Sequence, residues 1–174
     1  MSHYDATAPT GAPAPYGLVG FKNRAVAILP LHADGTVTLV GQARLPHGDY
    51  SWEIPEGGAP LSEDPLDGAK RELAEEVGLV AGDWREILRA QLSNSVTDEV
   101  MIGYLALNLS PADGGAQADD TEDLAIVRAP FAEVLEAAMA GHLQDMLTVA
   151  MLLRGYHMAR EGSLPRALAR AMLE

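Results

Sequence analysis

Residues 57–79 constrain the fold and the chemistry of this chain more than any other segment. The second part of the segment predicts a helix that begins after Asp64, a favourable N-cap residue, with Pro65 at the first helical position. Gly78 is typical of the position at which such a helix ends. Apolar residues recur along this helix at a spacing that places them on one face: Leu66, Ala69, Leu73 and Val77. The sequence therefore predicts an amphipathic helix that packs on a core.

The other face of this helix is unusually acidic. Glu72 and Glu76 are four residues apart, and Glu75 lies beside them. Like charges at this spacing destabilise a helix by about 0.2–0.5 kcal/mol per pair. Arg71 can offset Glu75 one turn on, but the pattern leaves no cation for Glu72 and Glu76. Hard divalent cations such as Mg²⁺ or Mn²⁺ favour such oxygen-only clusters, and a solvated acidic surface helix is the alternative.

The spacing of the whole segment resembles the Nudix box. Gly57 is followed after five residues by Glu63, and after seven more by the run RELAEEVGL at residues 71–79. The resemblance implies an enzyme that hydrolyses a nucleoside diphosphate linked to another moiety. It also implies that Glu72 and Glu76 hold Mg²⁺ or Mn²⁺ and that the arginine at the start of the run orients the glutamates.

One residue departs from the pattern of the box. Gly68 stands where relatives usually carry a helix former. We expect it to weaken the helix by up to ~1 kcal/mol without affecting the chemistry.

Length, composition and charge narrow the class of protein. A chain of 174 residues, 48% apolar and 21% charged, fits one soluble globular domain. The net charge of −13 argues against a general nucleic-acid or membrane surface, whereas bound metal ions would still allow a nucleotide to bind. The sequence has no cysteine, no basic-then-apolar leader and no apolar run long enough to span a bilayer, so we expect a cytoplasmic protein.

The remaining elements predict an α/β fold. Residues 1–15, rich in proline and alanine, are predicted to be a flexible N-terminal arm, and residues 16–174 a single Nudix hydrolase domain. Residues 25–31 predict a buried strand, with residues 36–42 as its hairpin partner. Further strands are predicted over residues 84–92, 100–109 and 121–130, and helices over residues 130–140, 146–160 and 165–173. This order predicts a mixed sheet between helices, in agreement with the Nudix-type α/β/α sandwich that the resemblance implies.

The lead-in to the box, SWEIPEGG at residues 51–58, resembles that of the ADP-ribose pyrophosphatase branch. On this resemblance the carbonyl group of Glu56 would bind a metal ion, and Arg44 would reach the substrate phosphates, which suits an arginine fork. A surface arginine at a strand end is the alternative. Trp52 and Glu53 are candidate substrate-binding residues, with a core position as the alternative for the tryptophan.

A glycine- and aspartate-rich loop at residues 110–121 precedes the strand at 121–130. The segment TEDL at residues 121–124 resembles the one after the mobile loop of ADP-ribose pyrophosphatases. On that match Asp120 takes the position of the general base and Glu122 that of a metal ligand. The family usually has glutamate as the base, and Glu75 is the alternative base here.

These features together predict hydrolysis of a nucleoside diphosphate sugar, with ADP-ribose as the leading candidate. The proline that ADP-ribose pyrophosphatases commonly carry after the box is absent from residues 81–99, which indicates a broader or different choice of sugar. Within that stretch, the polar run at residues 93–99 could contact a sugar or form a hydrogen-bonded turn. A nucleoside triphosphate pyrophosphohydrolase, a non-catalytic nucleotide-sensing module and a structural dimerisation domain are the alternatives.

The resemblance to the diphosphosugar branch also implies a homodimer. Its members pair through their N-terminal strands and complete each site with residues of the partner. The apolar residues 25–31 and the methionine-bearing residues 146–158 are candidate surfaces for this pairing.

Overall fold

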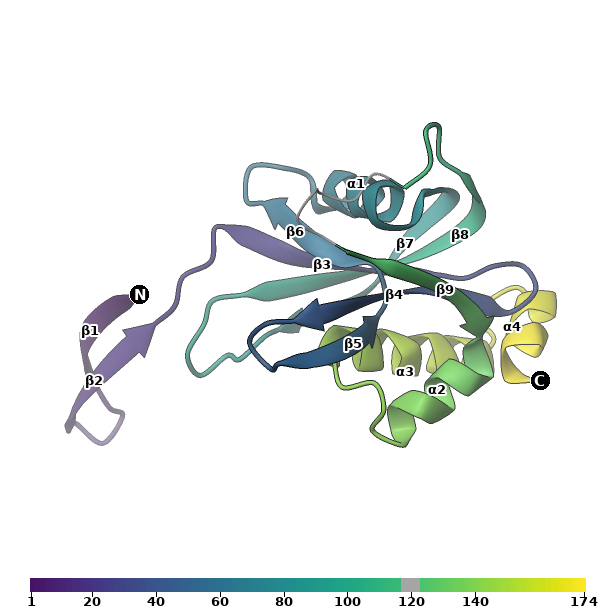
Figure 1. The fold of residues 1–174 in the computed structure, drawn as a ribbon. Helices are drawn as coiled ribbons and strands as arrows, with labels where there is room; N and C mark the ends of the chain where they lie inside the picture. The colour runs from purple at the N-terminus through teal and green to yellow at the C-terminus, as the bar shows by residue number, and fades with distance from the viewer. Residues whose placement is uncertain (117–122) are drawn as a thin grey trace.

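The computed structural model describes residues 1–116 and 123–174 (Figure 1). The strands are β1 (Ser2–Thr7), β2 (Pro13–Leu18), β3 (Asn23–Pro30), β4 (Thr36–Arg44), β5 (Asp49–Glu53), β6 (Glu56–Pro60), β7 (Leu79–Gln91), β8 (Val100–Pro111) and β9 (Ala125–Pro130). The helices are α1 (Pro65–Val77), α2 (Phe131–Met139), α3 (Met146–Glu161) and α4 (Arg166–Leu173). The predicted strands and helices are present in the predicted order, but β1, β5 and β6 are additional strands, and β7 begins directly after the end of α1 rather than at residue 84.

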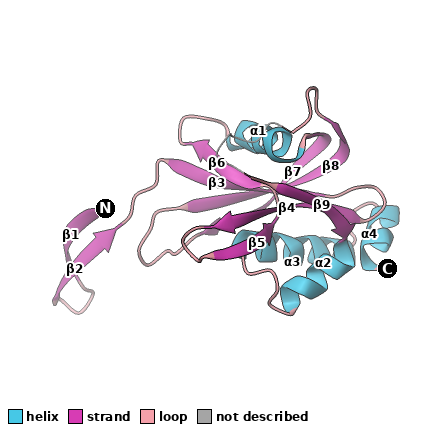
Figure 2. Cartoon of the chain, in the orientation of Figure 1, coloured by secondary structure: helices cyan, strands magenta, loops and turns pink. Residues whose placement is uncertain are grey.

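The strands lie in layers between helices. One sheet has the order β6-β3-β8-β7 and is mixed, because β3 and β8 run parallel while the other neighbours are antiparallel. A second, antiparallel sheet has the order β5-β4-β9. Helix α1 covers one side of the strands, and α2, α3 and α4 lie on the other (Figure 2). The predicted α/β/α sandwich with a mixed sheet is confirmed.

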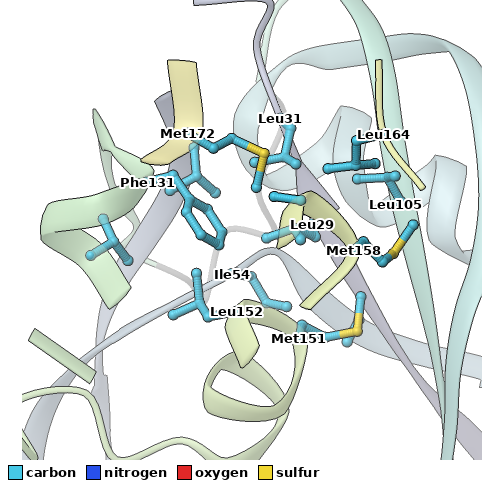
Figure 3. Close-up of a cluster of buried hydrophobic side chains, with 14 of the residues drawn as sticks. Leu29, Leu31, Ile54, Leu105, Phe131, Met151, Leu152, Met158, Leu164 and Met172 are labelled. Carbon is cyan, nitrogen blue, oxygen red and sulfur yellow. The ribbon is translucent and has the colours of Figure 1, made fainter. Parts of the chain in front are cut away.

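Strand β3 is buried on both faces and contributes to two cores. Val26 and Ile28 pack toward α1, in a cluster with residues of β6 and β8. Leu29 and Leu31 face the other way, where they lie near Phe131 and the side chains of α3 and α4 (Figure 3). Successive side chains of a strand point to opposite faces. A strand buried on both faces therefore has the continuous apolar sequence seen here.

The prediction that residues 25–31 and 36–42 pair as a hairpin is wrong. Both segments are strands, but β3 lies between β6 and β8, and β4 lies between β5 and β9. Only an isolated bridge between Leu31 and Val37 joins the two segments beside their turn. Each strand is already hydrogen-bonded on both edges by other partners, β6 and β8 for β3 and β5 and β9 for β4, so the two diverge into different sheets.

The prediction of a flexible arm at residues 1–15 is also wrong in its local structure. Strand β1 pairs with β2 along its whole length in an antiparallel hairpin, and Gly11 adopts a positive φ of 85° in the turn. The hairpin extends from the body of the protein (Figure 1). Every residue of β1 is exposed. Backbone pairing requires no apolar periodicity, which is why the sequence pattern did not reveal these strands.

The polar run at residues 93–99 forms a hydrogen-bonded turn, which was one of its two predicted structures. The amide of Val96 donates to the carbonyl oxygen of Ser93 at 2.9 Å. The carbonyl oxygen of Val96 accepts from the amide of Val19 at 2.8 Å. This turn therefore joins the segment that follows the N-terminal hairpin to the β7–β8 end of the larger sheet.

In the part of the chain that the structure describes, no helix is both long and apolar enough to cross a membrane.

Gly68 allows α1 to approach β6 closely. A Cβ atom at this position would lie 2.7 Å from the Cβ atom of Ala59 on β6, and Gly68 is buried. The glycine that weakens the helix by its propensity is therefore required by the packing of that helix.

We predict that Gly68→Ala destabilises the protein although alanine is the better helix former. Overpacking typically costs 1–3 kcal/mol and would exceed the gain of roughly 0.8–1.0 kcal/mol in helix propensity. Chemical denaturation should show a lower free energy of unfolding for this variant. The double variant Gly68→Ala/Ala59→Gly, which removes the opposing Cβ atom, should recover part of the loss. An increase in stability for the single variant would contradict the packing argument.

Candidate active site

Helix α1 has the caps that its sequence predicts. The side chain of Asp64 accepts a hydrogen bond from the amide of Leu66 at 3.0 Å, and Pro65 occupies the first turn. At the other end Gly78 has a φ of 65°, and its amide donates to the carbonyl oxygen of Ala74 at 3.0 Å. The side chains that pack toward β3, β6 and β8 are Leu66, Ala69, Leu73 and Val77, as predicted. This packing fixes the rotation of the helix and so places its glutamates.

Two glutamates of the box meet consecutive residues of β6. Glu76 is only 5% exposed, and its Oε2 accepts a hydrogen bond from the amide of Glu56 at 3.1 Å. The carboxylate of Glu72 lies against Gly57, where an added Cβ atom would be 2.2 Å from the Glu72 Cδ atom. The Glu72 carboxylate therefore occupies space that any side chain at position 57 would fill.

Arg71 connects the glutamates of α1 to β6. Its Nη1 donates to Glu72 Oε1 at 2.8 Å and to Glu75 Oε2 at 3.2 Å, while Nη2 donates to the carbonyl oxygen of Gly58 at 2.9 Å. Nη2 also lies 3.8 Å from Glu63 Oε2. The prediction that no cation remains for Glu72 is wrong, because one guanidinium group reaches both neighbouring carboxylates. These contacts suit the predicted role of Arg71 in orienting the glutamates.

Arg44, at the end of β4, is held by two carboxylates. Its Nε donates to both Glu53 oxygens, at 2.9 and 3.1 Å, and its Nη2 donates to Glu53 Oε2 and, at 3.1 Å, to Glu56 Oε1. Hydrogen bonding to Glu53 raises the pKa of Arg44. Glu53 itself is only 2% exposed, so this ion pair is shielded on the carboxylate side.

Glu56 carries a buried carboxyl group among other carboxylates. Burial raises its pKa well above the ordinary value, and the charges of Asp145 and Glu53 raise it further, whereas Arg44 lowers it. Its Oε2 atom is buried and has no hydrogen-bond partner among the described residues.

A cavity of about 690 Å³ lies beside this group. Its walls come from the end of β4, the β4–β5 turn, β5, the start of β6 and the connection between α2 and α3. The residues that line it are Arg44, Pro46, His47, Asp49, Tyr50, Ser51, Glu53, Glu56, His142, Gln144, Asp145 and Met146. Glu56 joins the cavity to the box, because its side chain lines the cavity while its amide contacts Glu76.

The first turn of α3 fixes one wall of the cavity. Asp145 caps this helix by accepting a hydrogen bond from the amide of Thr148 at 2.6 Å. The hydroxyl oxygen of Thr148, which is fully buried, accepts from the amide of Ile54 at 3.0 Å. The start of α3 is thereby tied to the residues between β5 and β6.

Most of the predicted site residues lie in two adjoining regions, the cavity beside Glu56 and the acidic face of α1. The two predicted substrate-binding residues that line the cavity are Arg44 and Glu53. The third, Trp52, packs against the core instead, with its ring edge-on to Tyr50 at a centroid distance of 5.7 Å. The residues placed on α1 are Arg71, Glu72, Glu75 and Glu76. The proposed base Asp120 and the proposed metal ligand Glu122 lie outside the described residues.

Sequence reasoning missed several residues that line the cavity, among them His47, Tyr50, His142 and Asp145. One signal was available: Asp145 directly precedes a predicted helix, which is a typical N-cap position. The others lie on a turn, a strand and a loop whose proximity depends on the fold.

The carboxylate and carbonyl oxygen atoms of this region are the type of ligand that a hard divalent cation prefers. The box supplies carboxylates, and the backbone of the adjoining strand β6 carries the carbonyl group of Glu56. Within residues 1–116 and 123–174, however, no three acidic, histidine or cysteine side chains converge in a metal-binding arrangement. The residues thus fit a metal ion by type.

Comparisons with known proteins agree with this architecture. The NUDIX domain family model matches residues 21–148. An ADP-ribose pyrophosphatase of Mycobacterium tuberculosis is 29% identical over 145 residues, which cover 83% of this chain and 70% of that protein. A GDP-mannose pyrophosphatase of Pectobacterium atrosepticum is 28% identical over 134 residues, covering 74% and 69%. A solved structure described as an ADP compounds hydrolase shares the fold, with a TM-score of 0.78, 23% identity and coverage of 90% and 84%.

The chain therefore belongs to the NUDIX domain family, which confirms the prediction from the box, and it is a Nudix hydrolase. Enzymes of this family generally use divalent metal ions.

We predict that Gly57→Ala lowers the hydrolytic rate by about 10²-fold while the protein stays folded. An added Cβ atom would displace the Glu72 carboxylate, and displacements near 1 Å can cost this much. Gly58→Ala is the matched control, because its Cβ atom would meet only the amide end of the Asn23 side chain, at 2.9 Å. Steady-state kinetics and circular dichroism of both variants provide the test. Equal losses in the two variants would show that the position of Glu72 is not the cause.

Proposed function

We propose that the protein hydrolyses the pyrophosphate bond of a nucleoside diphosphate sugar, with ADP-ribose as the leading candidate. The products would be AMP and ribose 5-phosphate. The observation that carries this proposal is the junction at Glu56, where the carboxylates of the box adjoin a polar cavity that contains Arg44. Relatives named for the hydrolysis of ADP-ribose and of GDP-mannose support the same class of substrate.

The proposed metal ligands are Glu72, Glu76 and the carbonyl group of Glu56, with Glu122 as a further candidate. A bound Mg²⁺ or Mn²⁺ would neutralise the diphosphate and lower the pKa of the attacking water. Arg71 supports this arrangement, because it hydrogen-bonds Glu72 and the carbonyl of the adjoining strand at once.

Arg44 would bind a phosphate oxygen of the substrate and stabilise the charge that develops there. Its bidentate contact with the buried Glu53 fixes the plane of the guanidinium group. The Arg44 side chain is 36% exposed and lines the cavity, so it is accessible from there. Glu53 would thus act by positioning Arg44.

The proton of the attacking water requires a carboxylate base. Glu75 is 46% exposed and is held by Arg71, so it is accessible for this role. Asp120 is the other candidate. A large loss of activity for Glu75→Gln with no effect of Asp120→Asn would assign the base to α1, and the reverse result would assign it to residue 120.

We predict that Glu72→Gln and Glu76→Gln each reduce the rate by orders of magnitude. Each substitution removes a charge needed to bind the metal ion and leaves the packing of α1 nearly unchanged. Glu86→Gln is the matched control, since Glu86 lies exposed on β7, where its carboxylate pairs with Arg89 and not with a residue of the box. Near-normal rates for both box variants at saturating Mg²⁺ would place the metal site elsewhere.

The choice of substrate can be tested with a panel of diphosphosugars, dinucleotides and nucleoside triphosphates, assayed with Mg²⁺ and with Mn²⁺. We expect the highest kcat/KM for a diphosphosugar, with a nucleoside monophosphate and a sugar phosphate as products. Preferential release of pyrophosphate from a triphosphate would overturn this substrate class. Tight nucleotide binding without any turnover would favour a sensing module.

We also propose that the protein is a homodimer that pairs through its N-terminal hairpin. The hairpin of β1 and β2 is exposed and extends from the body, so it is available to a second copy (Figure 1). Of the two surfaces expected from the sequence, residues 25–31 are not available, because β3 is buried within the chain, whereas residues 146–158 include exposed apolar side chains such as Met146 and Leu153. Light scattering at micromolar concentration should give the mass of a dimer, and removal of residues 1–18 should give a monomer. A monomeric full chain would contradict the proposal.

A further inference from the structure

The cavity beside Glu56 is rich in hydrogen-bond acceptors. Among its lining residues are four carboxylates and one guanidinium group, Asp49, Glu53, Glu56, Asp145 and Arg44. The guanidinium already contacts two of these carboxylates. A cavity with this surplus of negative charge would repel a further phosphate group remote from Arg44. It favours an uncharged ligand that carries several hydrogen-bond donors.

One carboxylate oxygen of a residue that lines this cavity lacks a hydrogen-bond donor. Oε1 of Glu56 accepts from Arg44 at 3.1 Å, whereas Oε2 is buried without a hydrogen-bond partner among the described residues. Buried polar atoms are nearly always paired in folded proteins, and an unpaired one is costly. Oε2 itself is shielded, but the side chain is 14% exposed and lines the cavity, so a rotation of the carboxyl group would present Oε2 to a ligand there.

We propose that the side chain of Glu56 binds a hydroxyl group of the terminal sugar of the substrate, and that this cavity holds that sugar. The inference rests on the proposed function and adds a residue that determines specificity. A hydroxyl group can both donate and accept, so it can pair with Oε2 whether or not the carboxyl group carries a proton.

The position of the cavity agrees with this role. Arg44, the proposed phosphate ligand, and Glu56 are neighbours at 3.1 Å, so a sugar attached to a bound phosphate would enter the space beside them. The volume of about 690 Å³ is ample for a pentose or hexose phosphate. Tyr50, which is 55% exposed, also lines the cavity.

The test is a calorimetric titration of the full chain with reaction products in the presence of Mg²⁺, which requires no turnover. The ligands are ribose 5-phosphate, AMP and inorganic phosphate, and the proteins are the wild type, Glu56→Ala, Glu56→Gln and the surface control Glu86→Ala. Inorganic phosphate reports any change in the Arg44 contact, so the measured quantity is the affinity for each ligand relative to that for phosphate. Circular dichroism establishes that the variants are folded.

We expect Glu56→Ala to lower the relative affinity for ribose 5-phosphate about tenfold or more, as the loss of a hydrogen bond to a charged group does. Glu56→Gln, whose amide can still bond a hydroxyl group, should retain most of it, and the relative affinity for AMP should not change. Equal losses for ribose 5-phosphate and phosphate would overturn the proposal, since Glu56 would then act only through Arg44. A selective loss for AMP would assign the cavity to the nucleoside.

This result is separable from that of the proposed function. If the wild type hydrolyses no diphosphosugar, the proposed reaction fails. The titrations still decide whether Glu56 recognises a sugar hydroxyl group.

Discussion

The close contact between α1 and β6 is the constraint on which the rest of the site depends. Two glycines permit it: Gly68 on the helix faces Ala59, and Gly57 on the strand faces the Glu72 carboxylate. The absence of side chains at these two points brings the acidic face of the helix against the strand backbone. The carboxylates are then positioned by packing and by single hydrogen bonds, such as that from the Glu56 amide to Glu76. A helix with the same charges but a wider spacing would present them to solvent.

The electrostatics of the site follow from this crowding. Carboxylates from α1, β5, β6 and the start of α3 come together, and two arginines, Arg44 and Arg71, each bridge several of them. Arg71 acts on the side of the helix and Arg44 on the side of the cavity. The pKa of Glu56 is raised mainly by burial, and the charges of Asp145 and Glu53 raise it further although Arg44 opposes them. A site with this excess of negative charge is suited to a cation and to uncharged hydroxyl groups.

The helix of the box could be predicted because its signals are local in sequence. The strand partners and the cavity could not be fully predicted, because they depend on pairing between separate segments. Asp64, Pro65 and Gly78 act within one or two turns of their own position, so the caps and the bounds of α1 could be read directly. Three of the four partners of β3 and β4, namely β6, β8 and β9, come from later segments of the chain, and the turn between β3 and β4 indicated a hairpin that does not form. The cavity could be predicted only through Arg44, Glu53 and Glu56, since the residues that complete it come from the β4–β5 turn, β5 and the α2–α3 connection.

The buried hydroxyl of Thr148 links the hydrophobic interior to the cavity. It accepts a hydrogen bond from the amide of Ile54, whose side chain is part of the core (Figure 3). It also belongs to the helix turn that Asp145 caps. This wall of the cavity is formed by the start of α3, and the same helix contributes Met151 and Leu152 to the hydrophobic core. The start of α3 cannot shift without repacking of the interior. Adaptation of the cavity to a new ligand is therefore restricted on this side. The β4–β5 turn, which bears His47 and Asp49 on the surface, is the side on which the pocket is free to diverge.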